Sequence, residues 1–164
     1  MCGIVGYIGD KKASEILING LLRLEYRGYD SAGVATLENG EIVNLRTKGR
    51  VSGLIDLEKE TPLSGTSGIA HTRWATHGVP SVENAHPHFD NSKNFAVVHN
   101  GIIENYKELK EFLVSKGYSF YSETDTEAIP NLIHYYYTQE KSVLKAINKA
   151  CNELVRSFRI RNFI

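Results

Sequence analysis

Hydrophobic positions along this chain alternate between the spacing of strands and the spacing of helices. Residues 3–9 are predicted to form a strand, and residues 13–25 to form a helix, because apolar side chains there recur every three or four positions. Residues 33–37 and 42–47 flank the dipeptide Asn39-Gly40. That dipeptide favours a type I′ turn, in which both central residues have positive φ, and so predicts a hairpin.

The chain after residue 68 is predicted to form two strands and three helices. Residues 69–74 form one strand, and the apolar run 95–98 is a short buried strand that leads into the turn Asn100-Gly101. Helices are expected over residues 105–116, 127–138 and 142–155.

Local signals mark the helix ends. Asn105 with Glu108, and Thr124 with Glu127, have the spacing of capping boxes. Pro130 is irregular, because its missing N–H leaves a carbonyl unpaired inside a helix, so the helix either starts late or has a distorted first turn. Without a repeating βαβ unit, this order of elements indicates an α/β layered sandwich with antiparallel pairing.

Composition is that of a single globular domain. The chain has 164 residues, 41% of them hydrophobic, and no formal net charge. Basic residues are interspersed with acidic ones, which argues against nucleic-acid binding. We find neither a targeting signal nor an apolar stretch long enough to span a bilayer, so we expect a cytoplasmic protein without membrane association.

The two cysteines have different settings. Cys151 lies on an apolar helical stripe with Leu144, Ile147 and Leu154, which predicts a structural thiol in the core. Cys2 directly follows the initiator methionine. Removal of that methionine would give Cys2 a free α-amine, with a reference pKa of about 7.7–8.0, and hence a nucleophile with its own base. The alternative is an ordinary buried thiol.

Five segments stand out for their polar and glycine content: Met1-Cys2-Gly3-Ile4-Val5-Gly6, residues 27–33 (RGYDSAG), 71–78 (HTRWATHG), 99–105 (HNGIIEN) and 122–127 (SETDTE). Together they resemble the glutaminase domain of the glucosamine-6-phosphate synthase family, the isomerising glutamine–fructose-6-phosphate aminotransferases. Amidophosphoribosyltransferases and asparagine synthetases match these segments less closely. The resemblance implies an N-terminal-nucleophile hydrolase fold, which is a four-layer αββα sandwich.

The resemblance also implies hydrolysis of glutamine, which needs a nucleophile, a proton carrier and donors for the developing oxyanion. Cys2 is the candidate nucleophile, and its α-amine the candidate base and acid. Asn100 and Gly101 match the family's oxyanion hole, although an isolated Asn-Gly pair is equally typical of a tight turn. Arg27 and Asp30 are expected to order the backbone around Cys2.

Free glutamine also requires a positive group for its α-carboxylate and a negative group for its α-ammonium. Arg73 can hold a carboxylate through two parallel hydrogen bonds, and Asp125 has the opposite charge. The resemblance assigns both to the head of the substrate, with Trp74, Thr76 and His77 lining the same pocket.

Two other kinds of site are weighed and set aside. Among six histidines, His86-Pro87-His88 looks like a pair of metal ligands. We expect no metal, because the proline restrains the pair, no cysteine or carboxylate completes a recognised spacing, and the family uses none. No cofactor is expected either, pyridoxal phosphate included. The second kind of site is aromatic stacking on a nucleic acid by Tyr135, Tyr136 and Tyr137. On a helix these three rings point around the circumference, so we expect them to serve mostly in packing.

The last nine residues depart from the family. Residues 156–164 contain three arginines where the family continues with a small apolar strand. We therefore expect residues 1–155 to be a partial type 2 glutamine amidotransferase domain, incomplete at its C-terminus, with 156–164 as an atypical tail and the sugar isomerase domains absent.

Two functions remain open from the sequence. One is glutamine hydrolysis that supplies ammonia for converting fructose 6-phosphate to glucosamine 6-phosphate, with L-glutamine and the sugar isomerase domains as partners in a homo-oligomeric parent enzyme. The other is an inactive fragment, or a non-catalytic module for glutamine binding or assembly.

Overall fold

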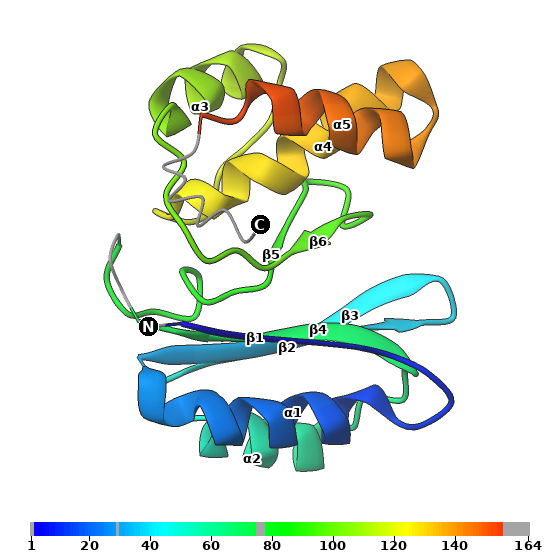
Figure 1. The fold of residues 1–164 in the computed structure, drawn as a ribbon, viewed down its shortest axis with the longest axis vertical. Helices are drawn as coiled ribbons and strands as arrows, with labels where there is room; N and C mark the ends of the chain where they lie inside the picture. Colours follow the sequence, from blue (N-terminus) through cyan, green and yellow to red (C-terminus); the bar gives the residue numbers. More distant parts are fainter. Residues whose placement is uncertain (1, 29, 75–77, 156–164) are drawn as a thin grey trace, which may run out of the picture.

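The computed structural model describes residues 2–28, 30–74 and 78–155 and arranges them in four layers (Figure 1). Two helices, a four-stranded sheet, a small two-stranded sheet and three further helices follow one another through the molecule. This is the predicted order of an αββα sandwich. Of the residues expected at the site, Thr76 and His77 lie outside the described residues, as does the tail 156–164.

The larger sheet has the strand order β1-β4-β2-β3, and every pair in it is antiparallel. Its strands are β1 (Gly3–Ile8), β2 (Ser31–Glu38), β3 (Glu41–Lys48) and β4 (Ser67–Arg73). The hairpin between β2 and β3 turns at Asn39 and Gly40, whose φ angles are 50° and 88°. Both values are positive, as the predicted type I′ turn requires.

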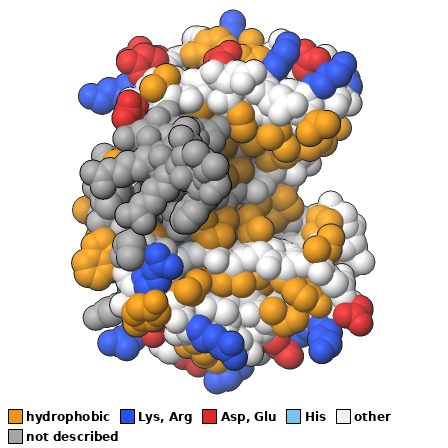
Figure 2. Space-filling model, in the orientation of Figure 1, with side chains coloured by type: hydrophobic (Ala, Val, Ile, Leu, Met, Phe, Trp, Pro, Cys, Tyr) orange, Lys and Arg blue, Asp and Glu red, His pale blue; other side chains and the backbone are white. Residues whose placement is uncertain are grey.

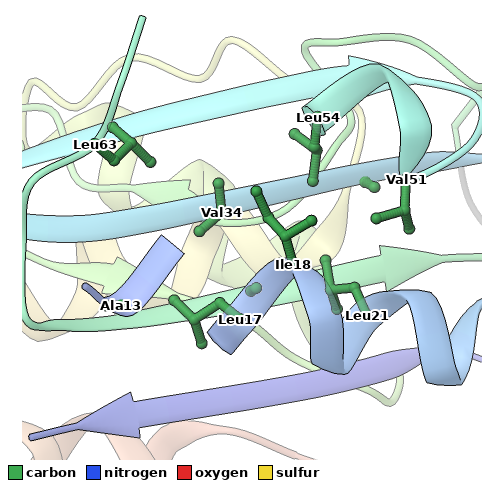
Figure 3. Packing of buried hydrophobic residues seen from close by; sticks show 10 residues of the cluster. Ala13, Leu17, Ile18, Leu21, Val34, Val51, Leu54 and Leu63 are labelled. Atoms are coloured by element: carbon green, nitrogen blue, oxygen red, sulfur yellow. The ribbon is translucent and has the colours of Figure 1, made fainter. Parts of the chain in front are cut away.

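One hydrophobic core lies between this sheet and the helices α1 (Ala13–Leu24) and α2 (Ser52–Glu60). Figure 3 shows Leu17 and Leu21 of α1 packed against Val34 of β2. Helix α2, which the sequence pattern did not predict, buries Leu54 alone among its residues. With one buried position in nine residues, its apolar periodicity is too weak to detect.

A second core lies among α3 (Tyr106–Ser115), α4 (Ala128–Glu140) and α5 (Val143–Glu153). Helix α4 also contacts the two short strands β5 (His88–Phe89) and β6 (Ala96–Val97), which form the small sheet. The expected strand 95–98 thus shortens to two half-buried residues. Tyr135 and Tyr137 stack edge-on against Phe112 and Phe95, as expected of packing residues.

The start of α4 settles the question raised by Pro130. A 3₁₀ turn, η2 (Asp125–Glu127), precedes the helix, which begins at Ala128. Pro130 is therefore the third residue of α4, where a backbone N–H would have no partner within the helix. The helix starts late, and the proline costs no hydrogen bond.

Both predicted capping boxes are wrong. Asn105 precedes α3, but its side chain accepts a hydrogen bond from the Val155 N–H at 3.0 Å and donates one to the Glu153 carbonyl at 2.8 Å. The Glu127 carboxylate reaches back to the N–H groups of Tyr121 and Ser122 at 2.9 and 2.7 Å. Asn105 thus bonds residues 48 and 50 positions away, and Glu127 bonds backbone upstream of the expected cap residue Thr124, so neither side chain caps its own helix.

The assignment of Cys151 to the core is also wrong, because its side chain is exposed. Helix α5 buries Ala146 and Ala150 instead, and leaves Leu144 70% exposed. Alanine lets two helix backbones approach closely, so the face that packs on α4 is the one with the smallest side chains.

An apolar groove of about 370 Å³ opens between the two sheets. Figure 2 shows hydrophobic side chains along the hollow between the upper and lower halves of the molecule. Leu37, Ile42, Ile69 and Phe95 are among its lining residues.

Among the described residues, no helix is both long and apolar enough to cross a bilayer.

Candidate active site

Antiparallel pairing of β1 with β4 brings Cys2 to the end of β4. Gly3 pairs with Thr72, so Cys2, one residue earlier, lies beside Arg73 and Trp74. The backbone N–H of Trp74 donates to the Cys2 sulfur at 3.3 Å, and the Trp74 carbonyl lies 3.7 Å from that sulfur. The half-buried thiol is thus held at the edge of the sheet, where a ligand can reach it.

The turn Asn100-Gly101 lies next to Cys2. The Asn100 side chain donates from Nδ2 to the Cys2 carbonyl at 3.4 Å, and its Oδ1 lies 2.8 Å from Nε2 of His71. A Cβ on Gly101 would lie 2.8 Å from the ring of His99, so this position has little room for a side chain. Asn100 and Gly101 therefore both lie close to Cys2 and line the same pocket.

Two opposite charges lie near this turn. Arg73 is only 4% exposed, and its Nη2 donates to the Gly78 carbonyl at 3.2 Å. Asp30 supports it, with a carboxylate oxygen 4.0 Å from Nη1 and a backbone N–H that donates to the Arg73 carbonyl. Asp125 accepts the Ile103 N–H at 2.7 Å, which ties η2 to the segment after the Asn100-Gly101 turn.

These residues line one pocket of about 310 Å³, which is the size of a small-ligand site. Its lining includes six of the eight residues predicted for the site: Cys2, Arg73, Trp74, Asn100, Gly101 and Asp125. Arg27 also lines it. Trp74 is 54% exposed, so its indole is open to solvent.

A cluster of buried imidazoles forms part of the pocket wall, with His71 and His86 among the lining residues. His86 stacks on His71 with ring centroids 4.2 Å apart, and His88 meets His86 edge-on at 4.6 Å. Burial lowers the pKa of His71 to about 4 and that of His88 to about 3, and it lowers the pKa of His86 well below its ordinary value. Positive charge on the neighbouring arginines and histidines acts in the same direction.

The imidazole cluster was not predicted, because its members come from β4, from a loop 15 residues later and from the start of β5. Its one local signal was the His86-Pro87-His88 sequence, which we considered as a metal-ligand pair. Within residues 2–28, 30–74 and 78–155, no three histidine, cysteine or acidic side chains are arranged to hold a metal ion. His88 instead bonds the hydroxyl of Thr124 at 2.8 Å, next to Asp125 in the chain.

Comparison with known proteins identifies the domain. A family model described as a glutamine amidotransferase domain matches residues 71–151. The chain contains a glutamine amidotransferase domain. The matched span of this amidotransferase domain holds Arg73, the Asn100-Gly101 turn and Asp125.

Curated relatives of the amidotransferase domain include two glutamine–fructose-6-phosphate aminotransferases (isomerizing). That of Clostridium perfringens is 56% identical over 160 residues, and that of Bacteroides thetaiotaomicron is 55% identical over 162 residues. Each alignment covers 98% of this chain and 26% of the relative. The chain thus spans about a quarter of the length of these relatives, and the predicted family resemblance is confirmed.

Two solved structures share the fold of the amidotransferase domain. One is a glutamine phosphoribosylpyrophosphate amidotransferase from B. subtilis complexed with ADP and GMP, with a TM-score of 0.80 and 25% identity over 95% of this chain and 33% of that chain. The other, described as the allosteric regulatory enzyme of purine biosynthesis, has a TM-score of 0.82 and 26% identity over 96% and 34% of the two chains. These matches confirm the predicted N-terminal-nucleophile hydrolase fold.

Proposed function

We propose that this amidotransferase domain hydrolyses L-glutamine to glutamate and ammonia, with Cys2 as the nucleophile after removal of Met1. The observation that carries the proposal is the single pocket lined by the Cys2 thiol, the Asn100-Gly101 turn, Arg73 and Asp125. A nucleophile, oxyanion donors and two opposite charges are the groups that the reaction requires.

In the proposed reaction, the Cys2 thiolate attacks the carboxamide carbon and forms a C–S bond. The resulting oxyanion accepts hydrogen bonds from Asn100 Nδ2 and the Gly101 N–H. The α-amine of Cys2 carries the thiol proton to the leaving nitrogen, the C–N bond breaks and ammonia departs. Water, activated by the same amine, then attacks the thioester, and breaking of the C–S bond releases glutamate and regenerates the thiol.

Recognition of the substrate head falls to the two charged residues. Arg73 binds the α-carboxylate and Asp125 the α-ammonium. The family resemblance assigns Trp74, Thr76 and His77 to the same binding role. Support comes from the burial of Arg73 and from the Ile103 N–H that orients Asp125, because a preoriented pair of charges selects a zwitterionic head group.

Within a longer protein, the ammonia would serve the conversion of fructose 6-phosphate to glucosamine 6-phosphate. The names of the relatives at 50–56% identity support this role. We therefore propose residues 1–155 as a partial type 2 glutaminase domain that works with sugar isomerase domains in a cytoplasmic homo-oligomer.

A binding-only role is the second candidate. The exposed apolar face of α5 and the groove between the sheets favour a module that assembles with other protein before it can turn over glutamine. Such a module retains affinity for glutamine but releases no ammonia.

The two cysteines provide a matched test. Cys2→Ala is expected to abolish ammonia release, whereas Cys151→Ala, at an exposed position of α5, is expected to leave the rate within about twofold. Intact mass and peptide mapping after treatment with an electrophilic glutamine analogue should show loss of Met1 and one adduct at Cys2 that glutamine blocks. Equal loss of activity in both variants contradicts the assignment, and glutamine binding without turnover supports the binding module.

A further inference from the structure

The amide of Asn100 has two ends, and only one of them can stabilise an oxyanion. Its Nδ2 donates hydrogen bonds, whereas its Oδ1 only accepts them. An amide rotated by 180° would place a carbonyl oxygen against the developing negative charge and destabilise it. The orientation of this one side chain therefore decides whether the pocket favours the reaction.

Two arrangements of Asn100 and His71 are compatible with the 2.8 Å separation of Asn100 from His71 Nε2. In the first, His71 is protonated on Nε2 and donates to Oδ1, so Nδ2 faces the Cys2 carbonyl at 3.4 Å. In the second, His71 is protonated on Nδ1 and Nε2 accepts from the rotated amide. Two acceptors, Asn100 Oδ1 and the Cys2 carbonyl, then face each other.

The burial of His71 discriminates between these arrangements. His71 is 1% exposed, and its Nδ1 is buried and makes no hydrogen bond with any described residue. The second arrangement would leave a buried N–H without an acceptor, which is unfavourable, in addition to the repulsion between the two acceptors. The first arrangement avoids both penalties.

The ring of His71 is also held in place. Strand alternation puts His71 on the face of β4 opposite Ala70, which lies in the core under α1. On its open face the ring stacks on His86, with an interplanar angle of 17°. Burial keeps His71 neutral near pH 7, because its pKa is about 4, so the ring carries a single N–H.

We propose that His71 is a positioning residue that donates from Nε2 to Asn100 Oδ1 and thereby aims the Nδ2–H of Asn100 into the pocket beside Cys2. The proposal rests on the proposed glutaminase function and goes beyond it, because His71 acts through Asn100 and touches no reacting atom.

The kinetic test compares two replacements of His71. Leucine removes the donor, and glutamine restores a donor near the position of Nε2. We expect His71→Leu to lower kcat at least about tenfold with KM changed less than about threefold, since a lost oxyanion donor costs about 10²–10³ in kcat. His71→Gln should recover most of kcat. His88→Leu is the control, because it removes an imidazole that does not contact Asn100. Its kcat shows how much activity is lost when the packing of the imidazole cluster alone is disrupted.

A double-mutant cycle with Asn100→Ala tests whether the two residues act together. If His71 works by orienting Asn100, His71→Leu should cost nothing further in the Asn100→Ala background. An undiminished loss in that background, or equal kcat for the leucine and glutamine variants at equal folding stability, overturns the proposal. Turnover that survives Cys2→Ala would overturn the proposed function instead.

The tautomer can be measured without turnover. Long-range ¹H–¹⁵N spectra of the full chain at pH 7 should show His71 neutral and protonated on Nε2. Protonation on Nδ1 overturns the proposal even if the chain releases no ammonia, and Nε2 protonation in an inactive chain upholds it while the proposed function fails.

Discussion

Arg73 illustrates how much of the candidate site depends on a single buried charge. Its guanidinium is almost enclosed, yet it lines the pocket and is oriented by the Gly78 carbonyl and by Asp30. A buried cation with oriented donors is suited to bind a carboxylate in two places at once.

Replacement of Arg73 by lysine keeps the charge but loses that geometry. We expect Arg73→Lys to raise KM for glutamine about 10- to 100-fold, since hydrogen bonds to charged groups contribute about 1.5–3 kcal/mol. Steady-state kinetics measure the change. Arg46→Lys is a matched control, because Arg46 contacts the Ala85 carbonyl at 3.3 Å and lies outside this pocket. Equal KM values for Arg73→Lys and the unmodified chain would show that Arg73 does not bind the substrate.

At the scale of elements, Gly33 is the residue that allows the backbone of β2 to lie directly against the backbone of His86. Gly33 pairs with His71 of β4, and the backbone of His86 passes directly over it. A glycine is required here because a side chain would occupy the space of the His86 carbonyl oxygen. The same close approach lets the ring of His86 stack on His71.

Addition of one methyl group to Gly33 tests this packing. A Cβ there would collide with the His86 carbonyl, so Gly33→Ala should lower the free energy of unfolding by about 1–3 kcal/mol. Gly6→Ala, in β1 of the same sheet, places its Cβ with no atom within 4 Å and should change stability by less than about 0.5 kcal/mol. Urea unfolding measures both, and equal midpoints would contradict the close approach.

Helix α5 shows where element-level reasoning fails. Its stripe of large apolar residues predicted a core face, but α4 packs against the alanine face. Periodicity reports that a helix has an apolar side, but it does not report which of two adjacent apolar sides meets the neighbouring helix.

At the scale of the whole molecule, the imidazole cluster couples stability to pH. Burial lowers the pKa values of His71 and His88 to about 4 and 3, whereas an unfolded histidine titrates near 6.5. The folded state therefore binds fewer protons than the unfolded state between these values. The contribution of these two histidines to the free energy of unfolding is fully present above pH 6.5. It is lost as the pH falls towards 4 for His71 and towards 3 for His88.

The pH window from 6.5 to 5 isolates this effect, because it lies above the ordinary carboxyl range. We expect the free energy of unfolding to fall by up to about 1.4 kcal/mol per pH unit for each buried histidine. Urea midpoints at pH 7.5 and 5.0 measure the loss. His88→Gln, which cannot titrate, should reduce the difference, and unchanged midpoints in the unmodified chain would contradict the assignment of neutral buried rings.

The sequence by itself determined most of the elements, the hairpin turn and the identity of six residues in the pocket. These depend on local spacing and on segments whose side-chain chemistry is specific to one reaction. The antiparallel pairing of β1 with β4, which brings Cys2 beside Trp74, was not among these predictions.

Only the tertiary structure decided how Asn105, Glu127, His71 and the two faces of α5 are used. Asn105 has a local capping role that the sequence suggests, but the fold gives it partners 48 and 50 residues away. His71 meets its partner Asn100 29 residues further along the chain. For His71, which is buried, the partner that the fold provides matters because burial removes water, and a polar group without a partner is then more costly than a lost local hydrogen bond. The orientation of Asn100 depends on such a group, since it is set by a histidine 29 residues away in the chain.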